Sequence, residues 1–233
     1  MKVLIVIPTL NESKNIKKII FKINKLYSNI DILIVDDNSK DGTINIFNKI
    51  KKREKNLKII IKKKEKGIGS AHLCGINFSY KNNYSTCITM DADGTHDPIK
   101  IKKMLNILKL KNVDIINTNR FLQNESLNDW PLIRKVITYL RYYLVKIILN
   151  TNYDSSSGFR CYNLKKIKKS YFSLVKNKNY FFLIKNLFFF EKLNFKIYEI
   201  SNKLKFRSAN KSKMKIYHII ESLLSLLRLR FLN

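Results

Sequence analysis

The chain has 233 residues, of which 45% are hydrophobic and 12% aromatic, and its formal net charge is +29. This hydrophobic content excludes a disordered chain despite the charge. No apolar run reaches the roughly 18–20 residues that cross a bilayer. The excess of lysine indicates either an anionic partner, such as nucleic acid or a membrane surface, or compositional drift, since Lys, Asn, Ile and Phe are all abundant. Arginine occurs only eight times, so its positions are the more informative ones.

The three cysteines, Cys74, Cys87 and Cys161, show no CxxC or Cys/His ligand spacing. They are typical of a reduced cytosolic protein and not of a disulfide framework. The first residues, "MKVLIVIPTLNE", predict a first strand and not a signal peptide. We therefore expect a protein that is soluble or held at the cytoplasmic face of a membrane.

Apolar runs alternate with helical patterns through the first half of the chain. Alternation at this spacing predicts βαβ units in an α/β fold with a mainly parallel central sheet flanked by helices. The pattern becomes helical from 131, a late strand is predicted at 195–201, and a C-terminal amphipathic helix at 214–232. The expected strands of the first half are 3–8, 31–37, 57–61, 85–91 and 113–118, and the helices between them are 13–27, 43–53, 69–80 and 98–110.

Acidic residues follow three of these strands. Glu12, the pair Asp36 and Asp37, and the pair Asp91 and Asp93 all lie at strand exits. One acid at such a position is more often a turn or helix cap. Three exits together predict a binding site, because ligands of open α/β sheets bind beyond the carboxyl ends of the strands.

Two loops carry glycine-containing motifs. "DDNSKDGT" (36–43) ends a strand and opens a helix, and its acids suit hydrogen bonds to a nucleotide's ribose or base. "KGIGSAHLCG" (66–75) fails the GxGxxG pattern, since His72 stands where the third glycine should be, and it lacks the Lys-Ser/Thr ending of a P-loop. A Rossmann dehydrogenase or P-loop NTPase is therefore not expected, and a loop touching a phosphate or base remains open.

The segment "MDADGTHDP" (90–98) places two carboxylates one residue apart after an apolar run. Mg²⁺ and Mn²⁺ prefer carboxylate oxygens and commonly combine one or two of them with substrate phosphates. Asp91 and Asp93 are therefore predicted to bind such a metal together with a diphosphate leaving group.

These motifs occur in the order found in dolichyl- and polyprenyl-phosphate mannose synthases, which the chain resembles from Val3 to about Arg230. The segments that carry the resemblance are "IPTLNE", "VDDNSKDGT", "KGIGSAHLCG", "MDADGTHDP", "TNRF", "WPLIRK", "DSSSGFR" and "FRSANKSKM". Those enzymes are inverting members of glycosyltransferase family 2 with the GT-A fold for nucleotide-diphospho-sugar transferases. "DDNSxDGT" and DxD mark the wider family, whereas "SSSGFR" and the late basic segment are similar to the polyprenyl-phosphate branch.

The resemblance implies a role for each matching residue. The predicted catalytic residues are Asp93, Arg120 and Asp154. The nucleotide sugar would be bound by Pro8, Glu12, Asp36, Asp37, Asp91, Ala92, Asp93, Arg207 and Lys213. The metal, Mg²⁺ or Mn²⁺, would be held by Asp91, Asp93 and Thr95. The acceptor phosphate would be bound by Arg120, Arg134, Ser157 and Arg160. Gly94, Thr95 and Asn210 depart from the family's usual residues.

The activity implied is transfer of a hexose, mannose from GDP-mannose, to a polyprenyl or dolichyl monophosphate. A dedicated general base is not required, since this acceptor is already anionic, so catalysis would rest on alignment and charge stabilisation. UDP-glucose or another nucleotide sugar is the alternative donor. "DSSSGFR" (154–160) also has a simpler interpretation as a turn that ends a helix.

A lipid acceptor requires contact with a membrane surface. We expect residues 1–212 to form the catalytic domain and 213–233 an amphipathic helix that either lies at the membrane interface or packs on the domain. The apolar segments 136–149 and 180–190 are further candidates for an acceptor-lipid groove, and the sequence leaves open whether a separate membrane-anchor subunit is a partner. A nucleic-acid-binding protein is disfavoured because lysine is spread along the whole chain. A non-catalytic partner-binding scaffold is disfavoured by the DxD motif.

Overall fold

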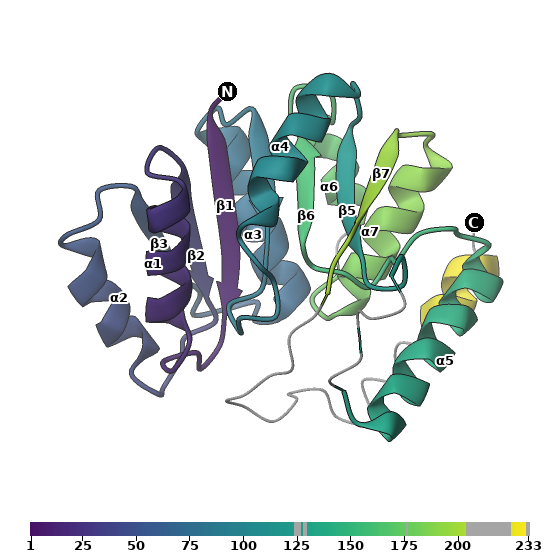
Figure 1. Ribbon diagram of the computed structural model, residues 1–233, viewed down its shortest axis with the longest axis horizontal. Coiled ribbons are helices and arrows are strands. Elements are labelled where there is room, and N and C mark those ends of the chain that lie inside the picture. Colours follow the sequence, from purple (N-terminus) through teal and green to yellow (C-terminus); the bar gives the residue numbers. More distant parts are fainter. Residues whose placement is uncertain (124–126, 128–129, 176, 204–224, 232–233) are drawn as a thin grey trace.

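The computed structural model describes residues 1–123, 127, 130–175, 177–203 and 225–231. Its centre is a seven-stranded sheet of strand order β3-β2-β1-β4-β6-β5-β7 (Figure 1). Every pair of neighbouring strands is parallel except the two pairs that involve β6. The strands are β1 (Val3–Thr9), β2 (Asp31–Asp36), β3 (Leu57–Ile61), β4 (Thr86–Thr89), β5 (Ile115–Asn119), β6 (Arg160–Asn163) and β7 (Ile197–Ser201).

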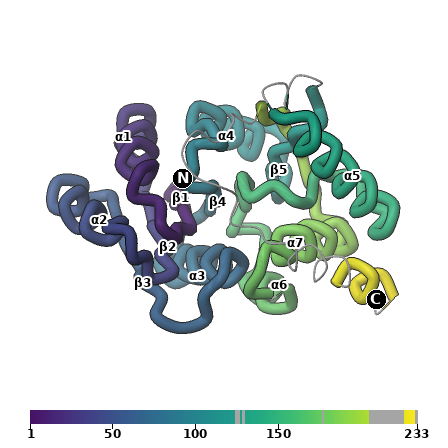
Figure 2. Tube along the Cα trace, turned by 90° about the horizontal axis from the view of Figure 1, so that it is seen from below, coloured from purple at the N-terminus to yellow at the C-terminus, as the bar shows by residue number. Residues whose placement is uncertain are grey.

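Helices cover both faces of the sheet, as Figure 2 shows. One apolar core lies between the sheet and α1, α2 and α4. A second lies between the opposite face and α3, α6 and α7. This double cover explains why strands β1 and β2, at the centre of the parallel part of the sheet, are apolar along most of their length. The helices are α1 (Ile16–Leu26), α2 (Thr43–Lys51), α3 (Ile68–Lys81), α4 (Lys100–Leu110), α5 (Leu132–Leu149), α6 (Lys169–Leu174) and α7 (Phe181–Lys192).

The predicted α/β fold with a mainly parallel sheet is therefore confirmed. Strand β3 has the predicted bounds, and the other predicted strands differ by a few residues at their ends. Strand β6 was not predicted, because four residues reading Arg-Cys-Tyr-Asn show no apolar run.

The glycines of "KGIGSAHLCG" allow close packing. A Cβ at Gly75 would lie 2.1 Å from Cγ1 of Val6 in β1, and one at Gly69 would lie 2.3 Å from the carbonyl oxygen of Asn177. Helix α3 can therefore approach the sheet and the 177–179 segment only because these positions lack a side chain. The sequence alone left open whether the segment 66–75 is a loop that touches a phosphate or base. Close packing accounts for two of its glycines, Gly69 and Gly75.

Most large side chains of the segment 180–190 lie in the interior, although Tyr180 is 41% exposed. In α7, Phe182, Leu187 and Phe190 are buried in the core beneath the sheet, and Phe181, Ile184 and Phe188 are buried in a smaller cluster with α5. The hypothesis that this segment lines a lipid groove is therefore wrong, since its large side chains are used in folding.

The described part of the C-terminal segment, 225–231, is helical. Leu226 and Leu229 are buried against α5 and α7, whereas Leu227 is 44% and Phe231 81% exposed. The rest of the predicted helix 214–232 lies outside the described residues. No helix in the described part of the chain is long and apolar enough to span a bilayer.

Candidate functional site

Two loops at the carboxyl ends of β1 and β2 are joined by hydrogen bonds. The Asn11 N–H donates to Ser39 Oγ at 2.8 Å, and the Glu12 N–H donates to Thr43 Oγ1 at 3.0 Å. Pro8 is buried within β1, one residue before the strand ends. The segments "IPTLNE" and "DDNSKDGT" therefore form one joined rim at this edge of the sheet.

Asp36 and Asp37 have different environments. Asp36 has no exposed surface, and its carboxylate accepts hydrogen bonds from Thr9 Oγ1 and from the Ser39 N–H and hydroxyl, each at 2.7 Å. It therefore holds the rim together from inside.

Asp37 has one carboxylate oxygen that is buried without a hydrogen-bond donor among the described residues. Its Oδ2 accepts the Gly67 N–H at 2.7 Å, while Oδ1 lies 3.6 Å from Lys62 Nζ and has no hydrogen-bond donor among the described residues. Burial raises the pKa of Asp37, and Gly67 and Lys62 offset only part of this. Both acids are buried in this structure, and their contact with a nucleoside stays a prediction.

The DxD motif forms a compact turn directly after β4. The Asp91 N–H donates to His96 Nδ1 at 2.9 Å, and the buried His96 ring stacks on Phe159 at 5.1 Å. Asp93 Oδ1 accepts the Thr95 N–H at 3.0 Å and its hydroxyl at 2.6 Å. Gly94 has a φ of +80°, so the turn uses the conformational freedom of glycine at this position.

The three predicted metal ligands, Asp91, Asp93 and Thr95, therefore belong to one turn, and Ala92 is buried between the two acids. No three His, Cys, Asp or Glu side chains converge into a metal site within the described ranges. Two carboxylates and a hydroxyl nevertheless fit a Mg²⁺ or Mn²⁺ ion that takes its other ligands from substrate phosphates and water.

The antiparallel strand β6 brings "DSSSGFR" to the same edge. Because β6 runs opposite to β4 and β5, its first residue, Arg160, pairs with Thr89 and Asn117 near their carboxyl ends. The preceding loop, 154–158, consequently lies beside the DxD turn. A Cβ at Gly158 would lie 3.1 Å from Asp91 Oδ1, so a larger residue would press on this carboxylate.

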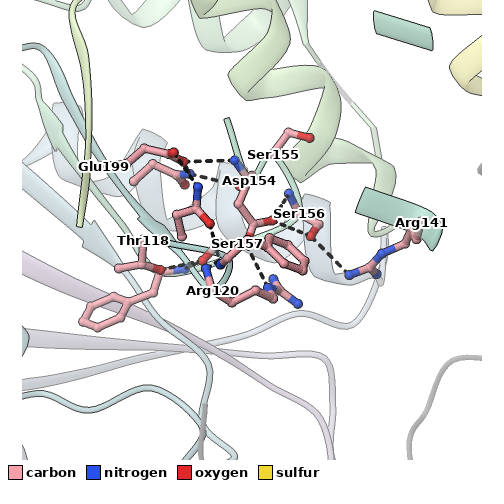
Figure 3. Close-up of polar contacts among 12 residues, drawn as sticks. Thr118, Arg120, Arg141, Asp154, Ser155, Ser156, Ser157 and Glu199 are labelled. Atoms are coloured by element: carbon pink, nitrogen blue, oxygen red, sulfur yellow. Dashed lines mark hydrogen bonds and ion pairs between the residues drawn. The ribbon is translucent and has the colours of Figure 1, made fainter. Parts of the chain in front are cut away.

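Asp154 is the buried centre of a polar network in this loop (Figure 3). Its Oδ2 accepts Arg120 Nε at 2.8 Å, and its Oδ1 accepts the Ser156 hydroxyl at 2.8 Å. Arg141 Nη2 donates to Ser156 Oγ at 3.2 Å. Burial alone would raise the pKa of Asp154, but Arg120, Ser156 and Arg141 together lower it, so the carboxylate is ionised at neutral pH.

Glu199 of β7 supports this network from behind. Its carboxylate accepts the Asp154 N–H at 3.0 Å and the side-chain amides of Asn117 and Asn119 at 2.7 and 2.6 Å. Burial raises the pKa of Glu199, although these donors counteract the effect. The loop is thereby fixed to β5 and β7.

Two predicted acceptor-phosphate residues lie inside the protein. Arg160 is 0% exposed, and its guanidinium donates to Asn117, Asn186 and the Ser155 carbonyl. Ser157 is buried, with its Oγ 2.6 Å from Thr118 Oγ1. In this structure both support the loop, and Arg160 has no surface from which to contact an acceptor.

The remaining predicted basic residues are placed as follows. Arg134 lies in the first turn of α5, with its guanidinium 4.3 Å from the centre of the Trp130 ring. Arg207 and Lys213 lie outside the described residues. The structure thus assembles Asp91, Asp93, Arg120 and Asp154 around one edge, and their individual roles stay predictions.

Sequence reasoning missed Arg141 and Glu199. Arg141 lies in an apolar helical run, and Glu199 is an ordinary polar position of a strand. Neither belongs to a motif. The scarcity of arginine was the only signal that could have singled out Arg141.

The mainly parallel sheet with its ligand edge and DxD turn defines a nucleotide-diphospho-sugar transferase domain of the GT-A class. A model of Glycosyl transferase family 2 matches residues 4–170, and the chain belongs to this family. It is therefore a glycosyltransferase.

Relatives in two bacteria match nearly the whole chain. An undecaprenyl-phosphate mannosyltransferase of Micrococcus luteus is 25% identical over 92% of this chain and 88% of that protein. A polyprenol monophosphomannose synthase of Mycolicibacterium smegmatis is 26% identical over 95% of this chain and 84% of that protein. These names agree with the resemblance inferred from the motifs.

Solved structures support the fold. Glucosyl-3-phosphoglycerate synthase from Mycobacterium tuberculosis, in complex with Mn²⁺, UDP-glucose and phosphoglyceric acid, has a TM-score of 0.66 at 16% identity, over 98% of this chain and 79% of that chain. A complex of the same enzyme with Mg²⁺ and UDP has a TM-score of 0.63 at 15% identity, over 97% of this chain and 79% of that chain.

Proposed function

We propose that the chain transfers mannose from GDP-mannose to the monophosphate of a polyprenol at the cytoplasmic face of a membrane. The observation that carries the proposal is the contact between the two halves of the site, where Gly158 of the 154–158 loop borders Asp91 of the DxD turn. The diphosphate expected at the acids and the acceptor expected at Arg120 would then be neighbours. The names of the two bacterial relatives support a mannosyl donor and a polyprenyl-phosphate acceptor.

The reaction is a direct displacement. An oxygen of the acceptor phosphate forms a bond to the anomeric carbon while the bond from that carbon to the diphosphate oxygen breaks. The nucleoside diphosphate leaves with the electron pair, and the configuration is inverted. The acceptor oxygen is already deprotonated near neutral pH, so no proton has to be removed during attack.

Each part of the site has a task in this reaction. Asp37 and Glu12 lie on the rim where the nucleoside would bind. Asp91 and Asp93 would hold Mg²⁺ or Mn²⁺, which would supply positive charge to the leaving diphosphate. Asp154 fixes Arg120 in position through its carboxylate, and Arg120 would bind the acceptor phosphate.

The surface of α5 supports a membrane location. Ile133, Val136, Leu140, Tyr143 and Ile147 are more than half exposed, and their spacing puts them along one side of the helix. Such a stripe suits contact with a lipid acceptor and with the membrane interface. The wider division into a catalytic domain, 1–212, and an interfacial helix, 213–233, remains part of this proposal.

Transfer of labelled sugar into organic-extractable lipid tests the donor. The purified chain is incubated with undecaprenyl phosphate vesicles, Mg²⁺ or Mn²⁺, and either GDP-mannose or UDP-glucose. We expect transfer from GDP-mannose that is lost with a chelator and in Asp93→Asn. Transfer from UDP-glucose alone would overturn the mannose assignment and keep the mechanism.

A further inference from the structure

Two arginines from separate elements converge on the 154–158 loop. Arg120 follows β5, and Arg141 lies in the middle of α5. Figure 3 shows both guanidinium groups on the same side of this loop, facing one another. Arg120 donates to Asp154 and Arg141 to Ser156, whose hydroxyl in turn donates to Asp154. One buried carboxylate thus orients both cations.

The charges of this group do not balance. Asp154 contributes one negative charge, while Arg120 and Arg141 contribute two positive charges. Arg141 donates only to a neutral hydroxyl in the part of the chain that the structure describes. Burial, followed by the positive charge of Arg120, lowers the pKa of Arg141 to about 10, although Asp154 opposes the change. Arg141 therefore remains cationic at neutral pH, and Asp154 can neutralise only one of the two guanidinium groups, while the Glu199 carboxylate binds the Asp154 N–H from the opposite side.

Both guanidinium groups have donors left over. Arg120 uses Nε toward Asp154, and no acceptor within the described ranges binds its two terminal nitrogens. Arg141 uses only Nη2. Paired donors of two arginines match the oxygens of a phosphate monoester, which carries between one and two negative charges near neutral pH. A carboxylate or an uncharged alcohol would match this arrangement less well.

Helix α5 joins this cationic group to an apolar surface. Arg141 contacts the 154–158 loop, whereas its neighbours Leu140 and Tyr143 are 58% and 53% exposed. A ligand with a phosphate head and a hydrocarbon tail could contact both sides of one helix. The acceptor of the proposed reaction has this chemistry.

We propose that Arg141 binds the acceptor phosphate together with Arg120, as the second arm of a two-guanidinium clamp ordered by Asp154 and Ser156. This inference rests on the proposed function for the identity of the acceptor. The clamp selects a phosphorylated lipid over the free alcohol.

The test compares Arg141→Gln and Arg141→Lys with Lys146→Gln, which removes one positive charge from the same helix outside the clamp. Initial rates are measured against polyprenyl phosphate and against the nucleotide sugar, and nucleoside diphosphate binding is measured by calorimetry. Arg141→Gln is expected to raise the KM for acceptor about 10- to 100-fold, as for loss of a charge-assisted hydrogen bond. Arg141→Lys should have an intermediate effect, and Lys146→Gln little effect.

Nucleoside diphosphate affinity should stay within about twofold in every variant, because the clamp does not contact the donor. An unchanged acceptor KM in Arg141→Gln would overturn the proposal, as would equal losses for donor and acceptor. If Arg141→Gln does not fold, the KM for acceptor and the nucleoside diphosphate affinity are compared in Arg141→Lys.

A binding experiment separates this inference from the proposed function. If the wild-type chain transfers no sugar to polyprenyl phosphate, inorganic phosphate and a short prenyl phosphate are titrated into wild type and variants. Binding that weakens in Arg141→Gln and not in Lys146→Gln would support the clamp even though the proposed reaction had failed. Equal binding by all variants, or none by the wild type, would overturn the clamp.

Discussion

Replacing Glu199 by glutamine tests the support of the 154–158 loop. The two oxygens of Glu199 accept three N–H donors, from Asn117, Asp154 and Asn119. Glutamine keeps one oxygen, so its amide must face at least one of these donors. If the amide faces Asn119, that residue cannot simply rotate to offer its oxygen, because the oxygen already accepts the Phe121 N–H at 2.7 Å.

At least one hydrogen bond to a charged acceptor is therefore lost in Glu199→Gln, and two donors are forced together. The expected loss is about 2 kcal/mol in the free energy of unfolding at neutral pH. For a chain of this size, that corresponds to a fall of about 4–8 °C in Tm. Urea unfolding followed by circular dichroism measures the first quantity, and differential scanning calorimetry the second.

Glu191→Gln is the matched control. Glu191 accepts the hydroxyl of Thr151, and a glutamine carbonyl can accept the same hydrogen bond, so its stability should change by less than about 0.5 kcal/mol. Loss of sugar transfer should accompany the stability loss only in Glu199→Gln, because this residue orients Asp154. A Glu199→Gln chain as stable as its control would refute the assignment of three donors to one carboxylate.

Three further changes test other parts of the structure. Gly75→Ala should destabilise the fold by about 1–3 kcal/mol, because its Cβ would overlap Val6; Val6→Ala should restore part of this loss in urea unfolding, and strictly additive effects would argue against the contact. Burial lowers the pKa of His72 from 6.5 to about 3, so the neutral form is required for folding. Wild-type stability should therefore fall by up to about 1.4 kcal/mol per pH unit as pH drops below 6.5 toward 3, and His72→Gln should show a shallower dependence; equal slopes would contradict the assignment. Leu140→Gln should weaken flotation with anionic vesicles, whereas Leu110→Gln, at a position 80% exposed on α4, should not; equal flotation would remove α5 from the membrane contact.

The sequence predicts the proposed donor side of the site better than the proposed acceptor side. The acids after β1, β2 and β4 follow recognisable apolar strands, so the edge on which they gather can be inferred from the alternation of strands and helices. Asp91, Asp93 and Thr95 are also close together in the chain, and their turn is a local structure. Such features depend little on distant contacts.

The acceptor side depends on contacts between distant residues. Glu199 is 45 positions from Asp154, and Arg141 is 15 positions from Ser156. The antiparallel pairing of β6 with β4 and β5 places the 154–158 loop at this edge of the sheet. The four residues of β6 show no pattern that predicts a strand. Arg160 lies in the same strand and is buried, although the motif "DSSSGFR" on its own suggests that this residue binds the acceptor phosphate. The interior position of α7 also follows from tertiary packing, since an apolar segment can lie in a core or against lipid.

The most direct test of the central claim is a comparison of two acceptors that differ only in the phosphate. Vesicles containing polyprenyl phosphate or the corresponding free polyprenol are incubated with the chain, divalent metal and each labelled nucleotide sugar, and lipid-linked sugar is counted. We predict a mild-acid-labile glycosyl phosphate from the phosphorylated lipid, none from the alcohol, and none with Asp93→Asn. Transfer to the free polyprenol at a comparable rate would contradict the claim that the acceptor phosphate attacks the sugar.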